Sequence, residues 1–156
     1  MNSILENELP ETEELRDYLL DVLADQDLAY KLPGNNKTLG ELCLEMGLTQ
    51  QIYTQSFKTF TQDWNYRGYM PEVPDSVASF RAWFKKLDAE LIEAVAALSE
   101  DEVQHKQIDR GHGFTPSPFV QSQIYHEALL IFYAKVSIYL RALDKKFNDQ
   151  WQIGIG

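Results

Sequence analysis

The segment that decides the fold runs from Asp75 to Leu98 and reads DSVASFRAWFKKLDAELIEAVAAL. Its apolar side chains recur in steps of three and four, which is the spacing of one face of an α-helix. They are Val77, Phe80, Phe84, Leu87, Leu91, Val95 and Leu98. Charged residues such as Arg81, Lys85 and Asp88 fall off this stripe. Because Asp75-Ser76 supplies a polar cap, the segment predicts an amphipathic helix that buries one face.

Two segments that precede it have the same periodicity. From about Glu11 to Lys31, apolar residues form one stripe, and Arg16 falls with several acidic residues on the solvent side. The turn-forming residues Pro33-Gly34-Asn35-Asn36 predict the end of that helix. The next helix should begin at Thr38, where the hydroxyl and the Glu41 carboxylate form a capping box, and continue to about Asp63.

The last helical segment begins at Ser117-Pro118, with proline at the first helical position, and continues to Leu143. From Ala128 to Ala134 it is apolar on nearly every side, which predicts more than one neighbour, either within the bundle or across a dimer contact. We find no strand-like alternation of useful length. The sequence therefore predicts an all-α, antiparallel four-helix bundle that forms a single domain over residues 1–156.

The charge of the chain excludes two classes of partner. It has 14 Lys and Arg against 24 Asp and Glu, a net charge of −10, and a pI near 4.7. Such a surface repels phosphate backbones and anionic lipids, so we expect neither nucleic acid nor a membrane as partner. Cys43 is the single cysteine, and Met1 to Pro10 lacks the basic start and apolar run of a signal peptide. Both features favour a cytoplasmic protein.

Two segments resemble the DinB-like superfamily. The stretch from Thr38 to Gly47, TLGELCLEMG, is similar to the start of that family's second helix. The stretch from Tyr125 to Leu130, YHEALL, resembles its fourth-helix motif His-x-x-x-His. The resemblance implies a four-helix bundle, commonly a homodimer, whose complete members bind a divalent metal through three histidines. Some of those members are thiol-dependent transferases or isomerases.

Two of the three family histidines are missing from this chain. His126 matches the first histidine of the fourth-helix motif, Glu45 takes the second-helix position, and Leu130 replaces the remaining ligand. Leucine has no lone pair, so Glu45 and His126 form at most an incomplete site for zinc or nickel. We expect no metal cofactor. Instead, we expect Glu45 and His126 to form a hydrogen-bonded pair, which would offset the desolvation of a buried carboxylate. A divalent metal stays open as an alternative if His112 replaces the missing ligand.

Other side chains could line a site inside the bundle. Tyr53 lies about two turns after Glu45, and Gln123 lies one turn before His126, so both are candidate ligand-binding residues. The simpler interpretation makes Tyr53 a core residue and Gln123 a solvated one. Cys43 is expected to be a small core residue. In the loop after the second helix, Trp64, Tyr66 and Tyr69 could stack on a ligand, although the simpler interpretation is that they pack the loop.

Three functions compete. We favour a non-catalytic DinB-like protein that binds a small molecule in the bundle cavity, and its candidate ligand-binding residues are Glu45, Tyr53, His112, Gln123 and His126. The alternative is a divalent-metal-dependent thiol transferase or hydrolase that uses Glu45 and His126. The third is an interaction module whose third and fourth long helices support a homodimer or a partner contact. The sequence contains no Gly-rich phosphate loop, GxSxG or HExxH motif that would favour another enzyme class.

Overall fold

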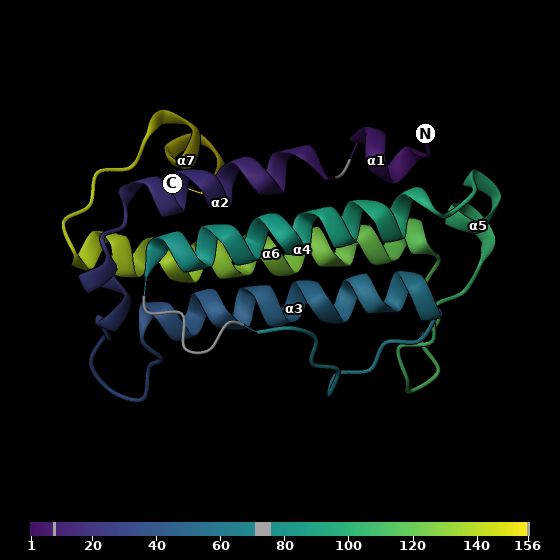
Figure 1. The fold of residues 1–156 in the computed structure, drawn as a ribbon, viewed down its shortest axis with the longest axis horizontal. Helices are drawn as coiled ribbons and strands as arrows, with labels where there is room; N and C mark the ends of the chain where they lie inside the picture. Colours follow the sequence, from purple (N-terminus) through teal and green to yellow (C-terminus); the bar gives the residue numbers. More distant parts are fainter. Residues whose placement is uncertain (8, 71–75, 156) are drawn as a thin grey trace.

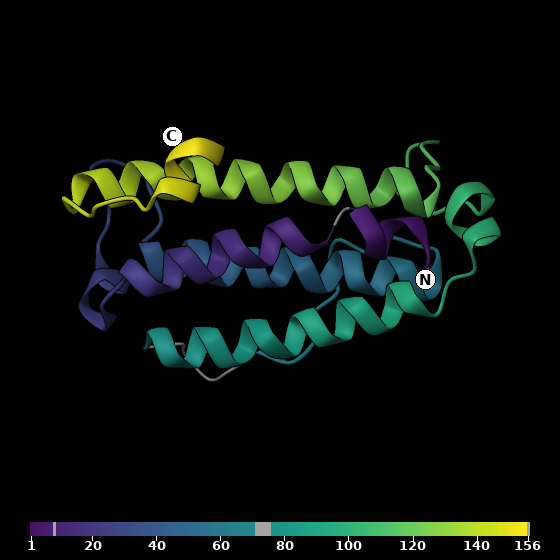
Figure 2. The same cartoon turned by 90° about the horizontal axis from the view of Figure 1, so that it is seen from above.

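Four long helices lie side by side and form a bundle (Figures 1 and 2). The computed structural model describes residues 1–7, 9–70 and 76–155; for residues 7 and 10–13 it describes the backbone only. The long helices are α2 (Pro10–Val22), α3 (Leu39–Thr59), α4 (Val77–Ala96) and α6 (Pro118–Ala142). The short elements are α1 (Ser3–Asn7), the 3-10 helix η1 (Asp25–Ala29), α5 (Glu100–His105) and α7 (Asp149–Gly154). The predicted all-α four-helix bundle is confirmed.

The helices α2 and α6 run in one direction, and α3 and α4 run in the other (Figure 1). Each helix of one pair is therefore antiparallel to both helices of the other pair, while α3 and α4 are parallel to each other. Residues after α3 turn back along the outside of that helix before α4 begins (Figure 1). The Gln51 side chain holds this return segment, because its Nε2 donates to Tyr69 O at 2.6 Å and its Oε1 accepts from Gly68 N at 3.1 Å.

The predicted helix starts are confirmed where the structure describes them. Thr38 Oγ1 accepts from Glu41 N at 3.1 Å, and Glu41 Oε2 accepts from Thr38 N at 2.7 Å, which closes the capping box of α3. Ser76 caps α4, with its Oγ accepting from Ser79 N at 3.1 Å. Asp75, the other half of the predicted cap, lies outside the described residues. Ser117 caps α6 directly before Pro118.

Two predicted helix ends are wrong. The first long helix ends at Val22 rather than near Lys31, because Leu23 takes an extended conformation. The Asp27 carboxylate accepts from Ala24 N at 2.7 Å and starts the separate 3-10 helix instead. The second long helix ends at Thr59 rather than at Asp63, because Phe60 takes a left-handed conformation with φ of 58°. Neither effect is visible as a change in hydrophobic periodicity.

The core follows the predicted stripes. Phe80, Phe84 and Leu91 of α4 are buried, as are Leu39 and Met46 of α3. Cys43 is fully buried, as expected for a small core residue, and desolvation raises the pKa of its thiol to about 12. Within the described residues, no helix combines the length and the apolar character needed to cross a membrane.

The apolar segment of α6 divides between the core and the surface. Leu129 and Tyr133 are completely buried, whereas Ile131 and Ile138 each expose 57% of their surface. The bundle of one chain therefore covers only part of the apolar surface on this helix.

Candidate functional site

Glu45 lies on the wall of a groove of about 310 Å³. The groove runs between the loop before α3 and the outer side of α6, so it flanks the bundle rather than occupying its interior. Its lining combines apolar and polar side chains. The apolar ones are Leu32, Leu42 and Ile138, and the polar ones, which we call the rim, are Asn35, Asn36, Lys37, Glu45, Lys135 and Tyr139. We call this cavity the Glu45 groove.

The start of α3 positions the rim. Because Thr38 begins the helix, Lys37 precedes it and Glu45 follows two turns later on the same side. Lys37 Nζ donates to Glu45 Oε2 at 2.6 Å, and both side chains are more than one-third exposed. Tyr139 Oη donates to Lys37 O at 2.6 Å and ties α6 to the loop. Desolvation is the main cause that raises the pKa of Tyr139, so its hydroxyl stays a neutral donor.

The predicted hydrogen-bonded pair of Glu45 and His126 is wrong. The Glu45 carboxylate pairs with Lys37 instead, and the buried Nδ1 of His126 has no hydrogen-bond partner within the described residues. The register of the helices explains the difference. The rings of Tyr53 and Tyr125 lie 5.0 Å apart, so His126 is level with Tyr53. Glu45 lies two turns earlier on α3, which is roughly 12 Å along the helix axis.

The side chains of Glu45, His126 and Leu130 do not form a site for the divalent metal that the family resemblance implies. The described residues contain no group of three or more His, Cys, Asp and Glu side chains that could hold an ion. Leu130, one turn after His126, offers no donor atom. His112 is exposed in the loop before α6, where its φ of 55° lies between two glycines that also have positive φ. We therefore derive no chemical step through a metal.

The remaining candidates separate into core and surface. Tyr53 is 2% exposed, as the simpler interpretation expects, and its hydroxyl accepts a long hydrogen bond of 3.4 Å from Arg110 Nη1. Gln123 is exposed. The buried glutamine of this turn is Gln121, which is completely buried and accepts from Arg110 Nη1 at 2.7 Å. Arg110 is thus a site residue that the sequence analysis missed. Its position in the same loop as the candidate His112, two residues earlier, could have indicated it.

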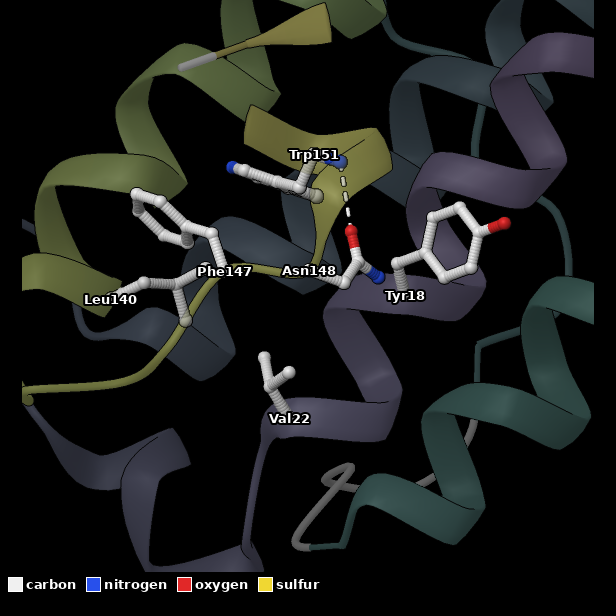
Figure 3. A pocket seen from close by; sticks show the side chains of 6 residues that line it. All are labelled: Tyr18, Val22, Leu140, Phe147, Asn148 and Trp151. Atoms are coloured by element: carbon white, nitrogen blue, oxygen red, sulfur yellow. Dashed lines mark hydrogen bonds between the residues drawn. The ribbon is translucent and has the colours of Figure 1, made fainter. Parts of the chain in front are cut away.

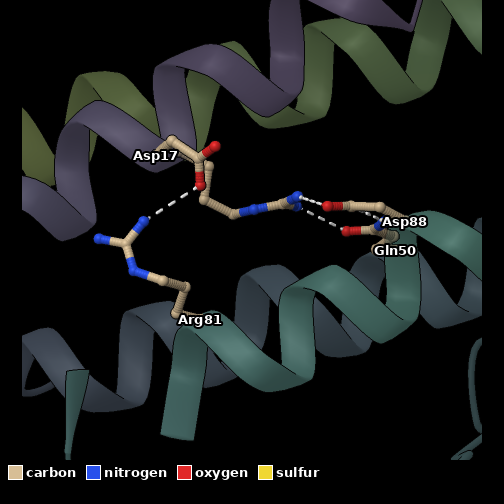
Figure 4. A network of polar contacts seen from close by, with 5 residues as sticks. Asp17, Gln50, Arg81 and Asp88 are labelled. Atoms are coloured by element: carbon tan, nitrogen blue, oxygen red, sulfur yellow. Dashed lines mark hydrogen bonds and ion pairs between the residues drawn. The ribbon is translucent and has the colours of Figure 1, made fainter. Parts of the chain in front are cut away.

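A second polar group lies inside the bundle and involves Arg16, which the sequence analysis placed on the solvent side. Arg16 is 3% exposed. Its Nη2 donates to Asp88 Oδ2, its Nη1 donates to Gln50 Oε1 at 2.9 Å, and Gln50 Nε2 donates to Asp88 Oδ1 at 2.8 Å (Figure 4). The guanidinium also lies 4.6 Å from the Phe84 ring centroid. Arg16 has the helical spacing of Leu19 and Leu23, which explains why it points inward.

The electrostatics of this buried triad favour its charged form. Desolvation, the largest single cause, lowers the pKa of Arg16, but the charge and hydrogen bond of Asp88 together with Tyr133 and Tyr125 leave the pKa above its ordinary value. Burial raises the pKa of the neighbouring Tyr133, so that hydroxyl stays neutral. Hydrogen bonds join the three side chains, while the buried Nε of Arg16 has no partner within the described residues. The triad is a packing element rather than an open site.

The contact between α7 and the bundle also leaves no room for a ligand. Tyr18, Val22, Leu140, Phe147, Asn148 and Trp151 line a depression there that does not admit a water molecule (Figure 3). Asn148 Oδ1 accepts from Trp151 N at 2.8 Å and caps α7. Trp151 Nε1 donates to Ser137 Oγ at 2.8 Å. These contacts fix the last short helix against α2 and α6.

Solved structures identify this arrangement. The DinB-like protein YjoA from Bacillus subtilis superposes with a TM-score of 0.71 at 12% identity, over 93% of this chain and 94% of that one. A DinB-like protein from Bacillus cereus superposes with a TM-score of 0.73 at 16% identity, over 93% of each chain. The chain has the DinB-like fold. No protein-family model matches the sequence, and no curated protein matches it significantly. The predicted resemblance to DinB-like proteins is thus confirmed through the fold.

Proposed function

We propose that this DinB-like chain is a non-catalytic protein that binds a small amphipathic molecule in the Glu45 groove without a metal. The groove itself supports the proposal. It is large enough for a metabolite-sized ligand, and it combines apolar side chains with a charged rim. Lys135 brings a positive charge to the rim, while Lys37 and Glu45 neutralise each other. The bundle interior at this level is filled by Met46 and Phe132.

Nuclear magnetic resonance can test this proposal with hexanoate and hexylammonium as probes. Either probe should shift the amide signals of residues that line the groove and leave those around Arg110 unchanged. Asn36→Trp should abolish the shifts, because the exposed Asn36 lies on the rim and an indole there fills the groove. Asn65→Trp is the matched control, since Asn65 is an equally exposed loop asparagine outside the groove. Binding that Asn36→Trp leaves intact would contradict the proposal.

Metal content distinguishes the metal-dependent transferase or hydrolase from this proposal. Protein purified without a chelator or a histidine tag should contain far less than one equivalent of zinc or nickel. A stoichiometric metal that is lost in His126→Ala would favour the enzyme, because the imidazole of His126 would then be a ligand. His105→Ala is the control, since His105 is exposed on α5 and pairs with Asp101.

We further propose that two copies of the chain associate through α6, in the cytoplasmic setting that the sequence favours. Val120 and Ile131 expose 39% and 57% of their surfaces on this helix. Such side chains are covered in a homodimer, where the interface core is apolar. Sedimentation should give twice the chain mass of 18.0 kDa, and Ile131→Glu should give the single mass. A wild-type monomer at high concentration would refute this association.

A further inference from the structure

A cationic and aromatic cluster lies at the end of the bundle where α3 stops and α6 begins. The Arg110 guanidinium carbon is 5.5 Å from the ring centroid of Tyr53, 5.4 Å from that of Trp64 and 6.0 Å from that of Phe114. The loops that carry these residues are joined by the backbone, since Gln62 N donates to Asp109 O at 2.8 Å. We call Arg110, Trp64 and Phe114 the Arg110 cluster.

Only one guanidinium nitrogen of Arg110 has a hydrogen-bond partner within the described residues. Its Nη1 donates to Gln121 Oε1 at 2.7 Å and, at 3.4 Å, to Tyr53 Oη. Arg110 is half-buried. Nη2 and Nε therefore keep donors in the planar fork that matches a carboxylate.

A buried amide next to Arg110 also has an unused donor. Gln121 Nε2 donates to Gln62 Oε1 at 2.7 Å, which fixes the orientation of the Gln62 amide. Gln62 is 6% exposed, and its Nε2 has no partner among the described residues. A buried donor without an acceptor is costly, so a ligand oxygen at this end of the bundle would be stabilising.

The two outer rings of the Arg110 cluster are available for stacking. Trp64 and Phe114 each expose 52% of their surface, unlike the buried ring of Tyr53. Within the described residues, neither Asp63 nor Asp109 forms an ion pair with Arg110; Asp63 accepts from Asn65 N and Asp109 accepts from Gly111 N. The cation therefore keeps its attraction for an anion although the whole chain carries −10.

We propose that the Arg110 cluster is a binding site for a small aromatic carboxylate. The carboxylate would accept from the free edge of the Arg110 guanidinium, and the ring would stack on Trp64 and pack against Phe114. A phosphate-rich polymer fits less well because the surrounding surface is acidic. This site lies at the opposite end of α3 from the Glu45 groove and does not depend on the function proposed for that groove.

The fluorescence of Trp64 gives a direct test. Trp83 and Trp151 are 3% and 2% exposed, so a ligand in solution reaches Trp64 alone among the three tryptophans. Benzoate should change the emission with saturation, while benzamide, its neutral analogue, should bind at least tenfold more weakly. Cyclohexanecarboxylate, which keeps the charge and loses the flat ring, should also bind more weakly than benzoate.

Variants assign the binding to the cluster. Arg110→Gln should weaken benzoate at least tenfold, and Arg110→Lys should weaken it less, because lysine keeps the charge but not the planar fork. His112→Ala is the matched control in the same exposed loop and should bind as wild type. Lys135→Ala should also leave the affinity unchanged, which distinguishes this site from the Glu45 groove.

Three results would overturn the proposal. They are equal affinity for benzoate and benzamide, unchanged affinity in Arg110→Gln, and loss of binding in Lys135→Ala. Circular dichroism of each variant shows whether it folds. If Arg110→Gln unfolds, Phe114→Ala replaces it as the deciding variant, because Phe114 is half exposed and its removal leaves the core intact. Phe114→Ala should then reduce the benzoate affinity severalfold, and an unchanged affinity would refute the stacking.

Discussion

Asp88→Ala should destabilise the bundle by leaving a buried guanidinium without its carboxylate. Arg16 is 3% exposed, and Gln50 would be its remaining hydrogen-bond partner, which is neutral. Breaking a buried ion pair from one side costs about 3–5 kcal/mol. The Asp88 side chain is 17% exposed, so water partly screens the site and we expect the lower value, about 3 kcal/mol.

The free energy of unfolding can be measured by urea titration, followed by circular dichroism at neutral pH. A loss of about 3 kcal/mol corresponds to a decrease in Tm of roughly 6–12 °C for a chain of this size. Arg81→Ala is the control, because it removes surface ion pairs of 2.7 Å with Asp21 and of 3.4 Å with Asp17. Figure 4 shows the pair with Asp17. Exposed pairs of this kind contribute less than about 1 kcal/mol.

A double variant separates the missing charge partner from lost packing. Arg16→Met in the Asp88→Ala background removes the uncompensated charge and keeps most of the side-chain volume. The double variant should therefore be more stable than Asp88→Ala alone. The reasoning fails if Asp88→Ala costs less than about 1 kcal/mol, or if adding Arg16→Met lowers the stability further.

Cys43, Gly47 and Asp27 each allow a further test of the packing and electrostatics of the bundle. Cys43 is buried and the pKa of its thiol is raised to about 12, so a disulfide reagent at pH 8 should modify it only after unfolding in urea; rapid labelling of folded protein would contradict this. A Cβ added by Gly47→Ala would lie 2.3 Å from ring atoms of Trp83, so this change should cost about 1–3 kcal/mol in urea unfolding. Desolvation raises the pKa of Asp27, but Lys145 at 2.6 Å and a backbone N–H lower it below its usual range. Asp27→Asn should therefore lower stability above about pH 4, and its deficit should shrink as the pH falls through the folded-state pKa.

The sequence predicted the helices well because hydrophobic periodicity and capping are local properties. The stripe from Val77 to Leu98 gave α4 within two residues, and the Thr38 capping box gave the start of α3. The helix ends were harder to predict. Phe60 ends α3 in a left-handed conformation without glycine, and Asp27 starts a 3-10 helix through one side-chain contact.

The site was less predictable because it depends on the register between helices that are distant in sequence. Glu45 and His126 were placed together through family positions, whereas the Tyr53–Tyr125 contact sets them about two turns apart. Arg16 was assigned to solvent from its charge alone, although its spacing matched the buried stripe. The partner that makes its burial favourable, Asp88, lies 72 residues away and leaves no local signal.

The interior of this bundle contains an ion pair between α2 and α4, and that favours binding at the surface. The triad of Arg16, Gln50 and Asp88 combines one positive and one negative charge with mutual hydrogen bonds. A ligand entering there would have to break an ion pair in a low-dielectric environment. The free energy required exceeds what the contacts of a typical small ligand contribute to binding. Surface sites impose no such cost, because Lys37 and Glu45 of the groove are more than one-third exposed and Arg110 is only half-buried. Leu130 is consistent with this division, since it leaves His126 without a second imidazole one turn away.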